Sequence, residues 1–189
     1  MSAVLASLVL TLQWCDPHRL FQHGWARIGN ELSRDFEPLQ LPVRFTRDVP
    51  EEAAGRIQVV LVRSEPVEWG LPPNAMGAVM SRSAPERQLY VFFPSVARVL
   101  GYRPEILRKR WPTPREERDL SRAFARVIAH EVIHAVLPAR LHTEKGLTCW
   151  KLDRSTLLAS RVEIDEVLAE ELRSALLQGL TSRPAPSSN

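Results

Sequence analysis

The amino-acid sequence predicts an α/β fold of the α+β type, in which a twisted mixed sheet is covered by helices on one side. Short apolar segments of strand length recur through the first half of the chain. Two longer segments with helical periodicity, residues 116–137 and a stretch that begins after residue 160, dominate the second half. Hydrophobic residues make up 44% of the chain, which is enough to form a real core.

Five strands are predicted from β-branched and aromatic residues or from a loose alternation of apolar and polar positions. The clearest is I-Q-V-V-L-V-R at residues 57–63. The predicted strands are residues 9–15, 41–45, 57–63, 76–81 and 88–93.

Helix-start signals place two helices in the first hundred residues. Asp16 and Pro17 predict the start of a helix over residues 17–36, because a cap residue followed by Pro is favoured at a helix N-terminus. Pro94 predicts a short helix that ends at residue 100. Residues 103–114 contain three prolines and are expected to form a surface connection.

Capping boxes predict the starts of the last two helices. Thr113 and Glu116 form such a box in front of the segment 116–137, which Pro138 then ends. Ser160 and Glu163 form a second box, which predicts the start of a C-terminal helix. The chain is therefore expected to form a single domain over residues 1–180, followed by a disordered C-terminal tail, residues 181–189.

The charge distribution excludes few partners. The net charge is only +3, and residues 108–110 form the only basic triplet, so we interpret the triplet as a solvated surface run and expect no nucleic-acid partner.

No apolar run is long enough for a membrane span, and residues 1–12 lack the charged start of a secretory signal. Cys15 and Cys149 form either a disulfide or two free thiols.

The segment H-E-V-I-H at residues 130–134 carries the strongest functional signal. Residues four apart lie on one face of a helix, so the imidazoles of His130 and His134 can reach one metal ion. Glu131 then lies beside the metal, where it can take a proton from a zinc-activated water. Residues 127–137 are apolar apart from these three residues, which predicts a buried helix.

A catalytic zinc site needs a third protein ligand. Pro138 ends the helix, and the short return through residues 139–141 can bring His142 to the metal. The alternative is a carboxylate from the C-terminal helix. The acidic candidates there are Glu163, Asp165, Glu166 and Glu170.

The stretch H-E-V-I-H-A-V-L-P-A-R-L-H-T-E-K-G-L-T-C-W resembles the metzincin zinc peptidases, and more closely a group of small bacterial metzincin-like proteins. The resemblance covers residues 127–150. It implies a zincin-type fold, zinc bound by the three histidines His130, His134 and His142, and Glu131 as general base. It also aligns residues 146–148 with the methionine turn of that family, and Trp150 with a later tryptophan.

Three departures from the metzincin pattern stand out. Seven residues separate His134 from His142, where the wider clan has five, although the small bacterial group shares the longer spacing. Pro138 replaces the expected Gly, so the turn after the helix must be built differently, and Thr148 replaces the Met of the turn.

These observations predict a zinc-dependent peptide-bond hydrolase that acts on a peptide or protein substrate. Zinc polarises the scissile carbonyl, and Glu131 accepts the proton of the attacking water. The strand at residues 76–80 is expected to pair with an extended substrate, and Arg140 is a candidate to stabilise the oxyanion. The alternative is a non-catalytic zinc-binding or regulatory protein on a degenerate peptidase scaffold. A three-histidine metal-dependent ribonuclease ranks below both, because its motif has Gly where Glu131 stands.

Overall fold

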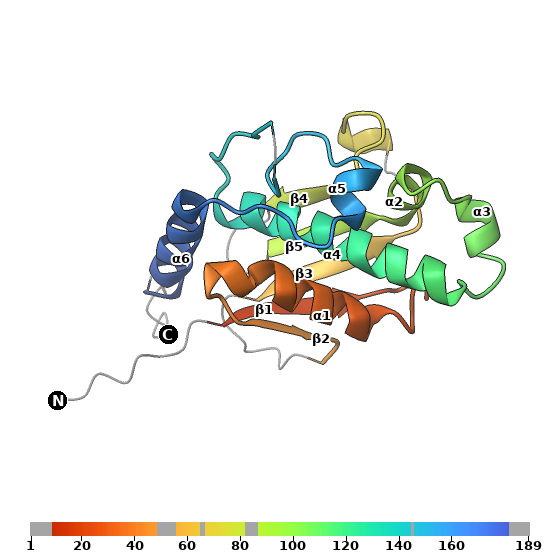
Figure 1. The fold of residues 1–189 in the computed structure, drawn as a ribbon, viewed down its shortest axis with the longest axis horizontal. Helices are drawn as coiled ribbons and strands as arrows, with labels where there is room; N and C mark the ends of the chain where they lie inside the picture. The colour runs from red at the N-terminus through yellow and green to blue at the C-terminus, as the bar shows by residue number, and fades with distance from the viewer. Residues whose placement is uncertain (1–8, 49–55, 65–66, 82–86, 145, 182–189) are drawn as a thin grey trace, which may run out of the picture.

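A five-stranded mixed sheet forms the centre of the fold (Figure 1). The computed structural model describes residues 9–48, 56–64, 67–81, 87–144 and 146–181. The strand order is β2-β1-β3-β5-β4, in which only the edge strand β4 runs antiparallel to its neighbour. The strands are β1 (Leu10–Cys15), β2 (Val43–Thr46), β3 (Ile57–Val62), β4 (Gly77–Ser81) and β5 (Arg87–Phe92). The prediction of a mixed sheet is therefore confirmed, and every strand boundary lies within two residues of its predicted place.

Side chains alternate between a buried and a more open face of this sheet. In β1 and β3 every second residue is buried, beginning with Leu10 and Ile57. The open face carries polar residues in register, and Gln88 donates to the Oε1 of Gln58 at 2.9 Å. The buried face is the one that the helices cover.

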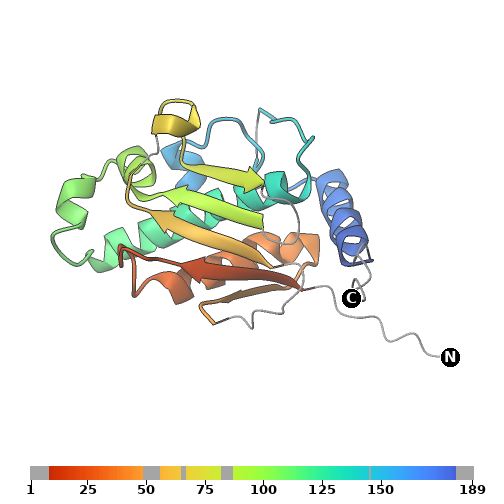
Figure 2. The same cartoon turned by 180° about the vertical axis from the view of Figure 1, so that it is seen from behind.

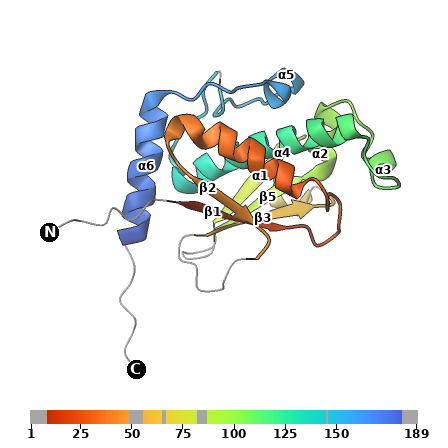
Figure 3. The ribbon, with the colours of Figure 1, turned by 60° about the horizontal axis from the view of Figure 1, so that its bottom comes forward.

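Helices α1 and α4 lie side by side on one face of the sheet, as Figure 3 shows. The view from behind in Figure 2 shows the strands in front of both helices. The core lies between these two layers, so the predicted placement of the helices on one side is confirmed. The helices of the described residues are α1 (Trp25–Phe36), α2 (Phe93–Val99), α3 (Pro104–Leu107), α4 (Pro114–Val136), α5 (Arg154–Leu158) and α6 (Glu166–Thr181), with single 3-10 turns at Glu37–Leu39 and Val67–Trp69.

Helix α4 begins and ends where the sequence predicts. The Thr113 side chain accepts from the Glu116 amide, and the Glu116 carboxylate accepts from the Thr113 amide at 2.7 Å, so both halves of the capping box form. The last helical hydrogen bond joins the Leu137 amide to the Ile133 carbonyl at 2.7 Å. Pro138 follows, and it has no amide hydrogen with which to continue the helix. No helix in the described part of the chain combines the length and apolarity that a membrane crossing requires.

Two predicted helix starts are wrong. Helix α1 begins at Trp25 rather than at residue 17, because the Asp16 carboxylate accepts from the Leu20 and Phe21 amides and closes a turn instead of a helix. Helix α6 begins at Glu166, because Asp165 rather than Ser160 caps it by accepting from the amide two residues after the helix start. In the first case a local side-chain bond competes with helix formation, and in the second a later residue provides the cap.

Two short helices were not predicted. Helix α3 lies within the proline-rich connection at residues 103–114, where Pro104 occupies its first position. Helix α5 lies after Trp150, and the Asp153 carboxylate caps it by accepting from the Thr156 amide at 2.8 Å. The predicted C-terminal tail falls almost wholly outside the described residues, since only Thr181 of it is described, as the end of α6.

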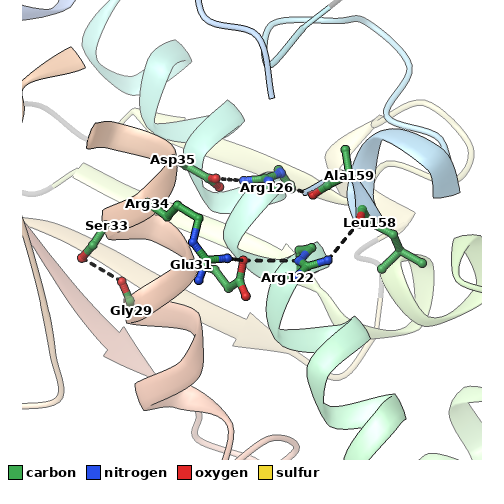
Figure 4. Close-up of polar contacts among 9 residues, drawn as sticks. All are labelled: Gly29, Glu31, Ser33, Arg34, Asp35, Arg122, Arg126, Leu158 and Ala159. Carbon is green, nitrogen blue, oxygen red and sulfur yellow. Dashed lines mark hydrogen bonds and ion pairs between the residues drawn. The ribbon is translucent and has the colours of Figure 1, made fainter. Parts of the chain in front are cut away.

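Buried charges join α1 and α4 to the end of α5 (Figure 4). Arg126 and Asp35 form an ion pair with side-chain exposures of 0% and 2%, and Arg126 also donates to the Ala159 carbonyl at 3.1 Å. One turn earlier on α4, Arg122 pairs with Glu31 at 3.3 Å at a more exposed position. These contacts fix the start of the segment after α5, which contacts the loop beside the histidines through the Glu163 carbonyl.

Candidate metal centre

Three imidazoles meet where α4 ends. The Nε2 atoms of His130 and His134 lie 3.1 Å apart, and the Nε2 atom of His142 lies 3.0 Å from that of His134. The candidate ligand atoms of the three residues all lie within 4.8 Å of one another. The structure thus brings together the three histidines that the sequence singles out.

A turn and a closed loop carry His142 back to the helix. The Arg140 amide donates to the Leu137 carbonyl at 3.0 Å, which reverses the chain after Pro138. An isolated β-bridge between Thr143 and Cys149 then closes the loop behind His142. A proline thus takes the place of the expected glycine without displacing the third histidine.

The backbone of this loop orients His130. Its Nδ1 lies 2.8 Å from the Leu147 carbonyl, so the N–H donates there and the Nε2 lone pair faces the other two rings. The Leu147 amide in turn donates to the Glu163 carbonyl. Gly146 has a φ of +78°, and a Cβ there would lie 2.7 Å from that same carbonyl, so only glycine fits.

The environment favours neutral imidazoles. The pKa of His130 falls to about 4, chiefly through burial and to a smaller extent through the neighbouring histidines, although its bond to Leu147 opposes this shift. Burial and the nearby His142 also lower the pKa of His134. Because the His134 Nε2 faces both other Nε2 atoms and can donate to only one, hydrogen bonds alone leave a lone pair unsatisfied. A cation among the three nitrogens removes this conflict.

Glu131 lies against β4 beside this cluster. A Cβ on Gly77 would approach the Glu131 Cγ to 2.7 Å and its Oε1 to 2.8 Å, so the absence of a side chain at Gly77 makes room for the carboxyl group. Burial raises the pKa of the Glu131 carboxyl to about 8. A nearby cation would lower this pKa again.

The histidines and Glu131 line a cleft of about 1140 Å³ between β4 and the end of α4. The segment from Leu71 to Val79 forms one wall, and the segment from Cys149 to Arg154 forms the other. Trp150 stands on this second wall with 71% of its surface exposed. A cleft of this size accommodates an extended segment of several residues.

The other candidates of the sequence lie elsewhere. Among the described residues the metal-ligand cluster holds no carboxylate; Asp165 and Glu171 both pair with Arg140, and Glu170 pairs with Arg173. Arg140 does not line the cleft, so the geometry gives no support to its role as oxyanion stabiliser. Cys15 and Cys149 are both free.

Sequence reasoning missed Gly77 and Leu147. Leu147 acts through its backbone carbonyl, which no residue pattern reveals. Gly77 matters through its distance from a residue far along the chain, and its only local signal is a glycine at the start of a strand. Comparisons with protein-family models, with curated proteins and with solved structures gave no match to this chain.

Proposed function

We propose that the protein is a zinc-dependent peptide-bond hydrolase with a zincin-like fold. The observation that carries the proposal is the convergence of three imidazole Nε2 atoms, with spacings of 3.0 and 3.1 Å, next to a desolvated carboxyl group in an open cleft. Together these supply the ligand set and the general base that metal-assisted hydrolysis requires.

The donor set fits zinc. Tetrahedral zinc with nitrogen ligands at about 2.1 Å separates those nitrogens by about 3.4 Å, close to the spacings in this cluster. Three neutral imidazoles form the ligand set of a catalytic site that keeps one position open. The bond from His130 to the Leu147 carbonyl is the outer support that such ligands commonly have.

Bound zinc would supply Lewis-acid polarisation of the scissile carbonyl and would acidify water. Glu131 would accept the proton of the attacking water and deliver it to the leaving amine. Gly77 leaves the space in which the Glu131 carboxyl would make both transfers.

The sheet edge suits an extended peptide substrate. Strand β4 is the terminal strand of the sheet, and its residues from Gly77 to Val79 line the cleft. A peptide that pairs with this edge would run past the histidines and Glu131. Substrate binding would then depend mainly on backbone hydrogen bonds, with side-chain preferences set by the opposite wall.

Zinc content and peptide turnover test the proposal together. We expect about one zinc per chain in the wild type and in Glu131→Gln, with casein turnover reduced 100- to 10,000-fold in the variant. His142→Ala should lose both zinc and turnover, whereas Glu170→Gln, a carboxylate outside the cleft, should keep both. Full turnover in Glu131→Gln with zinc retained would remove Glu131 as general base.

A second candidate is a zinc-binding protein without hydrolytic activity. It is favoured by the diversion of Arg140 to Glu171 and Asp165, which leaves this candidate oxyanion stabiliser outside the cleft. Stoichiometric zinc without cleavage of any member of a broad peptide library would favour this candidate over the hydrolase.

A further inference from the structure

A second cavity, of about 950 Å³, lies at the carboxyl ends of the neighbouring parallel strands β1 and β3. Residues 18–24, which follow β1, line it together with Arg63, which follows β3. Glu105 and Leu107 of α3, and residues 108–112 between α3 and α4, complete its wall. The carboxyl ends of adjacent parallel strands are a common location for ligand sites in α/β sheets.

This cavity is independent of the metal centre. It shares no lining residue with the cleft around the histidines. Glu117 lines it from the first turn of α4, and His130 lies thirteen residues further along that helix, roughly 20 Å away at 1.5 Å per residue. Helix α4 thus has a cavity at each end.

Most of the charged residues that line the cavity are cations. Four exposed cationic side chains line the cavity and make no ion pair or side-chain hydrogen bond among the described residues: Arg19, Arg63, Arg108 and Lys109. Two of the lining charges are already engaged, because Arg110 binds Glu116 through two nitrogens and Glu117 lies 3.7 Å from Arg27. Glu105 is the one lining carboxylate that has no such partner in the described chain.

An exposed indole stands beside these cations. Trp111 is 68% exposed, and the His23 ring meets it edge-on with 4.5 Å between centroids. Arg110 donates to the Trp111 carbonyl at 2.9 Å and is itself held by Glu116, so the backbone that carries the indole is anchored. An anchored aromatic ring next to a cationic surface is the arrangement that binds a base and its phosphate.

A constrained turn holds Arg19 at the cavity. The two amides that follow it donate to the Asp16 carboxylate at 2.8 and 2.7 Å. Arg19 itself has a φ of +55°, in the left-handed region that residues with a Cβ seldom adopt. The backbone position of Arg19 is therefore set by the fold before any ligand binds.

We propose that this cavity binds a nucleotide unit, with its phosphate among Arg19, Arg63, Arg108 and Lys109 and its base against Trp111. A free nucleotide and a single-stranded nucleic acid both present this chemistry. The sequence alone favoured a solvated surface run for residues 108–110 and no nucleic-acid partner. The fold changes that expectation, because it adds Arg19 and Arg63 from distant segments to the same surface.

Two probes separate the possible sources of the nucleotide. Fluorescence anisotropy of the full chain with a labelled single-stranded oligonucleotide tests nucleic acid, and competition by ATP tests the free nucleotide. Trp111→Ala should weaken binding roughly five- to a hundredfold without changing its salt dependence. Arg63→Ala should weaken binding and reduce the slope of log K against log salt by about 0.7.

Matched variants control for general effects. Trp150→Ala removes an equally exposed indole from the other cleft, and Arg161→Ala removes an exposed cation outside both cavities; neither should change binding by more than about twofold. The proposal is overturned if neither probe binds, or if Trp111→Ala and Arg63→Ala act no differently from their controls. It is also overturned if heparin binds as well as the oligonucleotide and Trp111→Ala has no effect, since the surface then recognises charge alone.

Discussion

The ion pair between Arg126 and Asp35 is the polar contact on which the packing of α1 against α4 depends most strongly. Both side chains are removed from water, and the second oxygen of Asp35 has no hydrogen-bond partner among the described residues. Burial lowers the pKa of Arg126 to about 10, so it keeps its charge at neutral pH. Arg126→Met would therefore leave an isolated buried carboxylate.

The expected costs follow from these surroundings. Removal of one partner of a buried pair destabilises a protein by about 3–5 kcal/mol. Arg126→Met should reach the upper part of this range, because the Ala159 carbonyl also loses its donor. Asp35→Ala should fall in the lower part, because the Glu31 carboxylate still attracts Arg126. The double variant should recover most of the loss, since no uncompensated charge remains.

Urea unfolding of the wild type, both single variants and the double variant measures this coupling. Arg122→Met is the matched control on the same helix (Figure 4), and its pair with Glu31, in which the Arg122 side chain is 32% exposed, should contribute no more than about 1 kcal/mol. Costs that simply add in the double variant, within about 0.5 kcal/mol, would refute the reasoning. Additive costs would mean that the interaction between Arg126 and Asp35 contributes nothing to the free energy of unfolding.

Three further substitutions test the site and the helix cap. Gly77→Ala should preserve zinc content and fold but lower peptide turnover about 100-fold, because its Cβ displaces Glu131. In a Glu131→Gln background the same substitution should have no further effect on turnover. Loss of zinc in Gly77→Ala would contradict this account. Gly146→Ala should weaken zinc affinity, measured by isothermal titration, 10- to 100-fold. The new Cβ would clash with the Glu163 carbonyl at a residue of positive φ and so disturb the Leu147 carbonyl that orients His130. Unchanged affinity would mean that this contact does not support zinc binding. Glu116→Gln should lower the free energy of unfolding by about 1 kcal/mol at pH 7. The pKa of Glu116 falls from 4.5 to about 2 on folding, chiefly through its hydrogen bond with Arg110, so the difference should shrink as the pH drops from 4.5 towards 2, and a difference independent of pH would contradict it.

The sheet and the central helix could be predicted because their signals are local. Strand β3 is rich in β-branched residues, and α4 begins at a complete capping box and ends before a proline. The start of α1 could not be predicted in this way. Asp16 and Pro17 match a helix cap, but the carboxylate binds amides four and five residues later and closes a turn. A sequence pattern does not reveal from which amides the side chain of a cap residue will accept hydrogen bonds.

The candidate site likewise has parts that local sequence patterns predict and parts that they do not. The spacing of His130 and His134 is a helical property, and Pro138 indicates that the chain turns back, so His142 was within reach of sequence reasoning. The supports of the site come from backbone atoms and from distant segments. The Leu147 and Glu163 carbonyls carry no residue signature, and the only local signal of Gly77 is a glycine at the start of a strand.

This division also separates metal binding from catalysis. The three histidines converge through a helix face and a proline-ended turn, with support from the Leu147 carbonyl, and none of these contacts involves β4. The proposed hydrolysis requires more than metal binding. Glu131 must be positioned against β4, and groups other than Arg140 must stabilise the negative charge on the oxyanion. A chain that lost hydrolytic activity would therefore lose it first through the contacts of β4 and the opposite wall, with the histidine cluster intact. For this reason Gly77→Ala separates catalysis from metal binding more clearly than Gly146→Ala, since it disturbs Glu131 and leaves the three histidines in place.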